Sequence, residues 1–313
     1  MSAVAPILHH YQTSPYSEKV RKILAFKKLP WRSVEIPPVM PKPDLMPLTG
    51  GYRKTPVLQL GCDIYCDTKL ISRVIDRLQP SPALIPAGLE ADTMIAERWV
   101  DQALFFNAVA LFVQPVGLAA FGAKAPGLLD AFMKDRAALF AQGGNQPLPC
   151  IETSRAELPG MLGALEAQLG NKPFLRGEQP CLIDFAIYHP VWFIHSNAGI
   201  AGELQPFPRV RAWTERILAL GSGDCSDLSG DEAIGVCRGT TSAQPPLAGA
   251  ELQLPSVKIG DGVEIAAKDY AIDVVTGELV IANAAEIAIR RRDERAGTVI
   301  VHFPPEGFSV KPR

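Results

Sequence analysis

The sequence predicts three structural units in succession: an α/β domain, an all-α domain and a small all-β module. Short apolar runs alternate with helical patterns up to residue 80, whereas apolar residues recur at helical spacing between residues 87 and 221. Beyond residue 250 the pattern changes to short alternating runs separated by turns that contain glycine. We therefore expect domains at 1–80, 87–221 and 250–313, with the Gly-, Ser- and Asp-rich residues 222–249 as a linker.

The composition is that of an ordinary soluble globular protein. The 313 residues are 47% hydrophobic and 20% charged, and 31 basic against 33 acidic side chains give a formal net charge of -2. This balance disfavours nucleic acids and anionic membranes as partners. Because the sequence has neither a long apolar run nor an export signal, we expect a cytoplasmic protein. The six cysteines form no Cys-x-x-Cys pair, so we expect neither a metal site nor a disulfide framework.

The first domain is predicted to have the order β-α-β followed by β-β-α. Residues 5–12 form the first strand, and Val20, Ile23 and Leu24 share one face of the helix at 16–28. Pro30 ends this helix. The remaining elements are a strand at 31–36, a proline-rich loop at 37–47, strands at 57–60 and 64–66, and a helix that begins at Asp67-Thr68.

The junction between the first strand and the first helix is suited to chemistry. Ser14 stands at the helix start, and Pro15 fits the first helical position because it has no N–H group. The helix dipole favours an anion there, so a ligand thiol held against Ser14 would ionise more easily than in water. The alternative is that Ser14 only caps the helix.

Three short segments occur in a characteristic order: Ser14-Pro15-Tyr16-Ser17, Thr55-Pro56-Val57-Leu58, and Asp67-Thr68 ahead of an amphipathic helix. This order resembles the thioredoxin-like domain of cytosolic glutathione transferases, of the bacterial type with serine at the catalytic position. The resemblance implies that Ser14 activates the glutathione thiol. It also implies a cis peptide bond before Pro56, which lets the backbone of Thr55 pair with the cysteinyl unit.

The same resemblance assigns the two ends of glutathione. Thr68 and the N–H groups at its helix start would bind the γ-glutamyl carboxylate, and Asp67 would neutralise the ammonium group. Lys54 would meet the glycyl carboxylate. The expected site is therefore Ser14, Lys54, Thr55, Pro56, Asp67 and Thr68.

The helical domain follows a linker rich in proline at 80–86. Phe105, Phe106 and Phe112 could line a pocket for an apolar co-substrate, although aromatic residues at helical spacing more often belong to a core. Residues 177–188 are similar to the second-domain signature of the family, in which Asp184 has a structural role at a helix start. Cys181 stands at the cap position, where the family usually has Ser or Thr. The resemblance covers residues 5–221.

The tail is predicted to form short strands at 256–259, 263–266, 271–275, 279–282, 287–290 and 298–303, as a barrel or a sandwich. Arg290-Arg291-Arg292 is followed by Asp293 and Glu294, which favours a solvated face over an RNA site. A module of about sixty residues has a marginal core of its own. We therefore expect it to dock on the rest of the chain or on a dimer partner.

The resemblance implies a glutathione transferase that acts in detoxification, with glutathione as co-substrate, a small electrophile as second substrate and no cofactor or metal. The family is usually dimeric, so a homodimer is expected. A thiol-disulfide oxidoreductase is less favoured, because Ser14 and Ser17 stand where that chemistry needs Cys-x-x-Cys. A third reading is a non-catalytic glutathione-binding or scaffold protein of this fold that works through its β-module.

Overall fold

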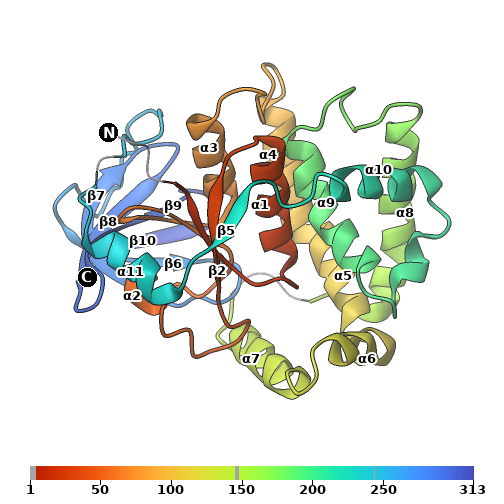
Figure 1. Cartoon of the computed structure of the whole chain (residues 1–313), viewed down its shortest axis with the longest axis horizontal. Helices are drawn as coiled ribbons and strands as arrows, with labels where there is room; N and C mark the ends of the chain where they lie inside the picture. Colours follow the sequence, from red (N-terminus) through yellow and green to blue (C-terminus); the bar gives the residue numbers. More distant parts are fainter. Residues whose placement is uncertain (1–4, 145–147, 243) are drawn as a thin grey trace.

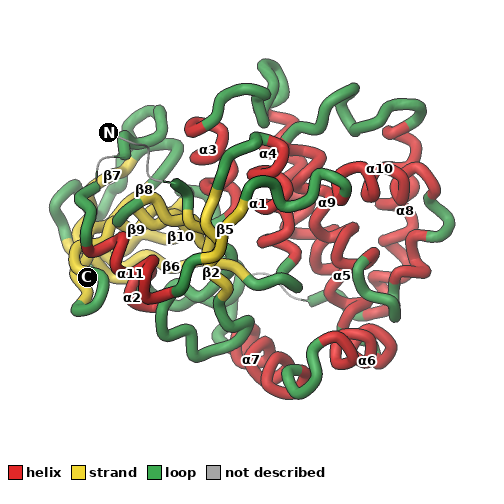
Figure 2. The backbone as a smooth tube through the Cα atoms, viewed as in Figure 1, coloured by secondary structure: helices red, strands yellow, loops and turns green. Residues whose placement is uncertain are grey.

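The computed structural model describes residues 5–144, 148–242 and 244–313. Strands gather on one side of the molecule and long helices on the other, as Figures 1 and 2 show. The predicted order of an α/β domain, a helical domain and a β-rich tail is confirmed. Among the described residues, no single helix has the length and apolarity to cross a membrane. One bent pair, Glu90–Phe112 with Pro115–Lys124, meets these criteria only when its two members are taken together.

The first domain has the predicted β-α-β and β-β-α order. Strand β1 runs parallel to β2 and antiparallel to β3, and β3 runs antiparallel to β4. Gly61, at φ 66°, makes the tight turn between β3 and β4, a conformation that costs glycine little. The elements are β1 (Ile7–His10), α1 (Pro15–Phe26), β2 (Trp31–Glu35), α2 (Met46–Thr49), β3 (Val57–Leu60), β4 (Asp63–Cys66) and α3 (Thr68–Leu78).

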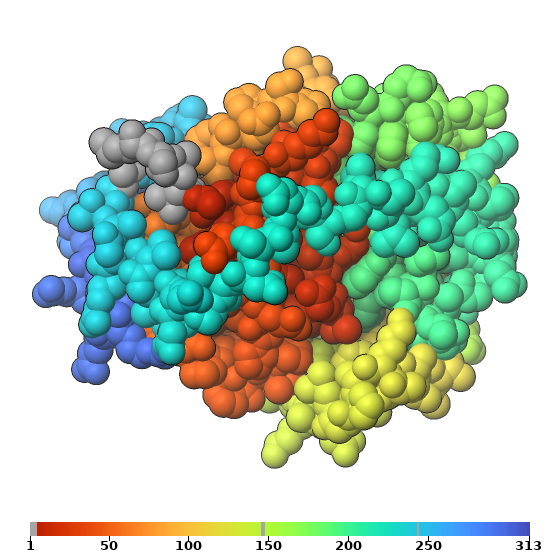
Figure 3. Space-filling view, viewed as in Figure 1, coloured from red at the N-terminus to blue at the C-terminus, as the bar shows by residue number. Residues whose placement is uncertain are grey.

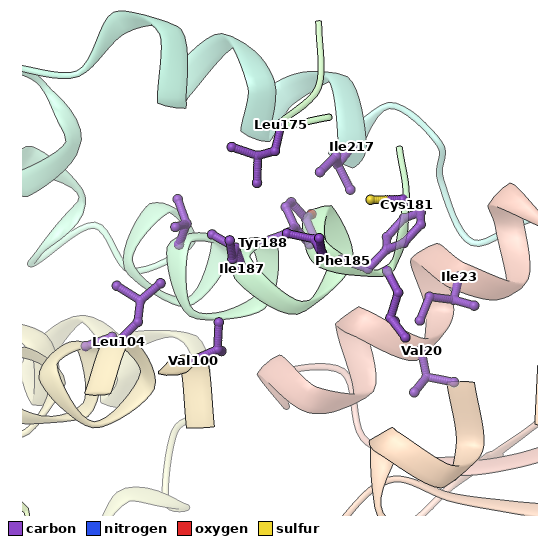
Figure 4. Packing of buried hydrophobic residues seen from close by; sticks show 14 of the residues in the cluster. Val20, Ile23, Val100, Leu104, Leu175, Cys181, Phe185, Ile187, Tyr188 and Ile217 are labelled. Atoms are coloured by element: carbon purple, nitrogen blue, oxygen red, sulfur yellow. The ribbon is translucent and has the colours of Figure 1, made fainter. Parts of the chain in front are cut away.

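The helical domain packs on α1 and α3 through one continuous apolar core. Figure 4 shows Val20 and Ile23 of α1 facing Phe185 of α9. Asp184 has the structural role predicted for it, since it accepts hydrogen bonds from the Leu175 and Cys181 N–H groups and from the Trp213 indole. The elements are α4 (Glu90–Trp99), the π-helix η1 (Val100–Leu104), α5 (Phe105–Phe112), α6 (Pro115–Lys124), α7 (Leu129–Ala141), α8 (Ile151–Leu169), α9 (Leu182–His195), the 3-10 helix η2 (Ala201–Leu204) and α10 (Pro208–Leu218).

The β-rich tail is neither a barrel nor a sandwich of its own, because it extends the sheet of the first domain. Strand β9 (Gly297–Phe303) pairs in parallel with β4, with Asp63 opposite Ile300 and Tyr65 opposite His302. The result is one sheet of ten strands in the order β10-β6-β7-β8-β9-β4-β3-β1-β2-β5. Docking on the rest of the chain is therefore confirmed, through backbone pairing that removes the free edge of β4.

The strands of the tail differ from the predicted set in number and position. Residues 256–259 and 271–275 do not form the two separate strands expected, and the last strand, β10, was not foreseen. Isolated stretches of four or five residues carry little periodic signal, which explains both errors. The elements are β6 (Gly262–Ala267), β7 (Val275–Ala282), β8 (Ile287–Asp293), β9 and β10 (Phe308–Pro312).

Residues 222–249, expected to be a linker, contain two elements. Strand β5 (Cys225–Asp227) pairs in parallel with β2, and helix α11 (Gly230–Arg238) follows it. Ser229 and Glu232 cap this helix reciprocally, while Ala233, Ile234 and Cys237 are buried against the sheet. Figure 3 shows this segment crossing the face of the first domain from the helical domain towards the tail. Its small polar residues cap a helix and form a sheet edge, so composition alone was misleading.

A buried ionic cluster joins the tail to the first domain beside the β4–β9 pairing. His302 of β9 lies between two carboxylates, with Nε2 3.0 Å from Asp63 Oδ1 and Nδ1 3.2 Å from Glu286 Oε2. All three side chains are at most 2% exposed. Burial by itself would lower the pKa of His302, but the hydrogen bonds to Asp63 and Glu286 outweigh it and raise that pKa. The two buried carboxyl groups therefore favour the cationic form of the imidazole that lies between them.

Candidate functional site

Ser14 lies at the N-terminus of α1, as the sequence predicts. Its side chain is buried, and its Oγ accepts a hydrogen bond of 3.2 Å from the Ser17 N–H group. Pro15 occupies the first helical turn. Since the hydroxyl group accepts this bond through oxygen, its own proton remains available to a group in front of the helix. The junction can thus stabilise an anion by the hydroxyl group and by the helix dipole.

A polar pocket of about 300 Å³ is lined by all five of the other predicted site residues. Lys54, Thr55, Pro56, Asp67 and Thr68 all line it. The peptide bond between Thr55 and Pro56 is cis, as the resemblance implied. The structure therefore brings together five of the six predicted residues, which come from the β3 entrance and the start of α3.

Asp67 and Thr68 are held by local geometry at the start of α3. Asp67 is the N-cap, at φ 73°, and its Oδ1 accepts the Lys69 N–H group at 2.8 Å. Thr68 Oγ1 accepts a bond of 3.3 Å from Lys19 Nζ. Asp67 keeps its second carboxylate oxygen for the pocket, which suits recognition of a cationic group.

Ser14 lines a second, apolar pocket of about 280 Å³ that adjoins the polar one. Both pockets are lined by Tyr16, Lys54, Thr55, Phe106 and Tyr270. Phe105, Phe106 and Phe112 border the apolar pocket, as one of the two alternatives predicted. All three side chains are also buried, so they contribute to the core as well. A ligand in the polar pocket can therefore present a reactive group beside Ser14 at the wall of the apolar pocket.

Asp101 and its partners were not predicted from the sequence. Asp101 lies in the π-helix η1, where its Oδ1 accepts the Tyr16 hydroxyl group at 3.2 Å and its Oδ2 lies 3.4 Å from Lys69 Nζ. Burial raises the pKa of this carboxyl group. π-Helical turns often mark functional sites, but the sequence pattern around residue 101 does not distinguish this turn from an ordinary α-helix.

Residues 268–274, here called the strap, cross from the tail over both pockets. Asp269 of the strap forms an ion pair with Lys54, with Oδ1 2.5 Å from Nζ. The ring of Tyr270 lies 4.3 Å from the same ammonium group and stacks on Phe140 at 5.5 Å. Lys54 is thus already partnered by a carboxylate, and Tyr270 stands where the two pockets meet.

The described residues do not indicate a metal site, and they place no cysteine at the described lining of the two pockets. Over the described ranges, no group of three or more His, Cys, Asp or Glu side chains is arranged to hold a metal ion. The lining residues described for the two pockets include no cysteine. Sulfur chemistry at the described lining would therefore use a sulfur atom that a ligand brings.

Comparison with known proteins defines the family. The family model of the glutathione S-transferase N-terminal domain matches residues 8–83, and that of the glutathione S-transferase C-terminal domain matches residues 115–220. The solved structure of a GST-like protein from Pseudomonas syringae is 39% identical, with a TM-score of 0.82 and full coverage of both chains. The chain belongs to the glutathione S-transferase family.

Two further solved structures share the fold. A glutathione S-transferase from Rhodospirillum rubrum F11 is 16% identical, with a TM-score of 0.53, over 77% of this chain and 96% of its own. The β-etherase LigF from Sphingobium sp. strain SYK-6 is 15% identical, with a TM-score of 0.51, over 70% of this chain and 96% of its own. None of the curated proteins searched matches this chain.

Proposed function

We propose that this protein is a glutathione transferase that uses Ser14 to activate the glutathione thiol for attack on a small electrophile. The observation that carries the proposal is the position of Ser14 at the start of α1, on the wall of an apolar pocket that adjoins a polar one. Glutathione would occupy the polar pocket and the electrophile the apolar pocket. No further cofactor is needed for this reaction.

The proposed mechanism follows from the polarity of the two pockets. Asp67 would neutralise the γ-glutamyl ammonium group, while Thr68 and the start of α3 would hold the adjacent carboxylate. The Ser14 hydroxyl group would donate to the sulfur atom and, with the helix dipole, favour thiolate over thiol. A decrease of about two units in the thiol pKa corresponds to roughly 2.7 kcal/mol. The thiolate would then form a bond to the electrophilic carbon, and the leaving group would take the electron pair of the broken bond.

One observation favours the non-catalytic alternative. Lys54, which would meet the glycyl carboxylate, is paired with Asp269. A chain that keeps this pair would bind glutathione weakly and would retain the fold for another role. The thiol-disulfide alternative has no such support, because Ser14 and Ser17 occupy the positions that its nucleophiles would need.

Calorimetric titration of the full chain with glutathione, followed by turnover with a panel of electrophiles, tests the proposal. We expect saturable binding and conjugation in the wild type. Ser14→Ala should keep glutathione affinity within a few-fold but lower turnover, because its hydrogen bond matters more to thiolate than to thiol. Full activity of this variant would refute the role of Ser14, and binding without any turnover would favour the non-catalytic alternative.

We further propose a cytoplasmic homodimer with a role in detoxification. Met94 and Ile95 of α4 are 57% and 67% exposed, and a second copy of the chain would cover them. Light scattering coupled to gel filtration gives the oligomeric state. If the wild type is a dimer and the Met94→Glu variant is a dimer as well, this face is not the dimer contact.

A further inference from the structure

The tail places one aromatic side chain in the site that the other two domains form. The two pockets share five lining residues, namely Tyr16, Lys54, Thr55, Phe106 and Tyr270. The first four belong to the first domain and the helical domain, whereas Tyr270 belongs to the strap. Tyr270 therefore stands at the boundary between the pockets, although it lies beyond the segment that matches the family's C-terminal domain.

Contacts with both other domains hold the Tyr270 ring in place. The ring stacks on Phe140 of α7, with centroids 5.5 Å apart and 19° between the planes, and it meets Phe106 of α5 edge to face at 6.0 Å. Lys54 Nζ lies 4.3 Å from the ring centroid, in a cation–π contact. Figure 1 shows α7, which carries Phe140, below the sheet that the tail extends. A ring that is packed in this way gives the pocket a fixed boundary.

The backbone of the strap is anchored on both sides of Tyr270. Asp269 pairs with Lys54, and Asp273 Oδ1 accepts a hydrogen bond of 3.3 Å from Gln142 Nε2. Gly144 approaches the Asp269 carbonyl group so closely that a Cβ atom on residue 144 would collide with the oxygen. The strap therefore has to break these contacts before Tyr270 can move aside for a larger ligand.

The size of the apolar pocket fits a compact ligand. A cavity of about 150 Å³ holds one benzene ring, so the 280 Å³ of this pocket corresponds to about two rings. On the side of the helical domain, Phe112 and Phe121 belong to the continuous apolar core, so this wall is not easily displaced. Tyr270 belongs to neither of the two apolar cores that the described residues form. It is therefore the part of the boundary that can change without a cavity in a core.

We propose that Tyr270 is a specificity-determining residue, which admits naphthalene-sized ligands to the apolar pocket and excludes ligands longer by one aromatic ring. Its effect on turnover rests on the proposed transferase function. Its effect on binding does not, because the contacts of the ring are present without glutathione.

Fluorescence titration of the full chain with 2-naphthol and with 6-phenyl-2-naphthol, in the absence of glutathione, tests the proposal. The two probes differ by one phenyl ring. We expect the wild type to bind 2-naphthol at least about tenfold more tightly than the longer probe. Tyr270→Ala leaves a space bordered by Phe106, Phe140 and the Lys54 ammonium group, which suits a further ring. It should bind the longer probe at least about tenfold more tightly than the wild type does, and 2-naphthol within about threefold.

Further variants separate the size of the side chain from damage to the strap. Tyr270→Phe keeps the ring and should keep the wild-type preference. Tyr270→Leu is a second variant in case Tyr270→Ala fails to fold, because it retains apolar contact with Phe140, and it should improve binding of the longer probe at least about threefold. Val274→Ala is the matched control, since Val274 is 47% exposed on the same strap, outside the described lining of both pockets. It should bind both probes as the wild type does.

Three results would overturn the proposal: no binding of 2-naphthol, equal affinity of the wild type for both probes, or the wild-type preference in both Tyr270→Ala and Tyr270→Leu. Turnover of the bromomethyl analogues of the two probes with glutathione separates this proposal from the transferase function. Conjugation by the wild type, with the same preference in both variants, would overturn only the role of Tyr270. A changed binding preference in the variants, without conjugation by any form of the protein, would support this role and overturn the proposed transferase function.

Discussion

Replacement of His302 by glutamine should destabilise the protein strongly, because it removes the imidazole that joins the tail to the first domain. The substitution eliminates the charged bonds to Asp63 and Glu286 and leaves both carboxylates buried beside a neutral amide. Removal of one partner of a buried ion pair lowers the free energy of unfolding by about 3 to 5 kcal/mol. The corresponding decrease in melting temperature is roughly 5 to 8 °C for a chain of this size.

Differential scanning calorimetry of the full chain measures this effect, and His195→Gln is the matched control. His195 also pairs with a carboxylate, 3.4 Å from Glu215, but this pair is exposed to solvent. The control should therefore change the free energy of unfolding by less than about 0.5 kcal/mol. Equal melting temperatures for His302→Gln and the control would refute the role of the ionic cluster.

The pH dependence gives an independent check. The pKa of His302 is raised in the folded protein, so its stabilising contribution is complete below the unfolded value of about 6.5 and is lost as pH rises through the folded pKa. The difference in unfolding free energy between wild type and His302→Gln should therefore be largest near about pH 6 and smaller near about pH 9. A difference that grows with pH would contradict the assigned charge of the imidazole.

Three further predictions concern the site and the tail. Asp67→Asn should weaken glutathione binding by about 1 to 3 kcal/mol in calorimetry. Helix α3 should stay intact, because Asn is an equally good N-cap. Equal weakening for S-methyl compounds that lack the γ-glutamyl unit would mean that the substitution damages the helix. Asp269→Asn should free Lys54 and tighten glutathione binding up to about fivefold, since such half-exposed pairs contribute at most about 1 kcal/mol; unchanged affinity would exclude competition by Asp269. Removal of residues 250–313 should lower the melting temperature and promote aggregation, because it uncovers the β4 edge and the apolar core below it; a stable, monodisperse fragment would show that the tail is dispensable.

The parts of the fold that the sequence predicted depend on local signals. A serine and a proline at a helix start, a Thr-Pro pair ahead of a strand and an acidic cap before an amphipathic helix each act within a few residues. These signals located Ser14, Pro56 and Asp67, and the structure places their segments around adjoining pockets. Order along the chain was informative because β-α-β connections bring such segments to one edge of a sheet.

The parts that were missed depend on contacts between distant residues. Pairing of β9 with β4 leaves no periodic trace in either strand, so the extension of the sheet was not predictable from the pattern. The contacts of Asp101 with Tyr16 and Lys69 join three separate segments and have no motif. Helix α11 was an avoidable error, since Ser229 and Glu232 have the spacing of a capping box ahead of an apolar stretch.

The parallel pairing of β4 with β9 has a consequence for synthesis of the chain. Asp63 and Ile300 are direct partners in the sheet, although 237 positions separate them in the sequence. At about 5 to 20 residues per second, the ribosome needs roughly 10 to 50 s to make the intervening chain. During this interval the first domain is complete in sequence but presents the unpaired N–H and C=O groups of β4. The nascent protein therefore depends on its last strands to protect an edge that its first eighty residues have already formed.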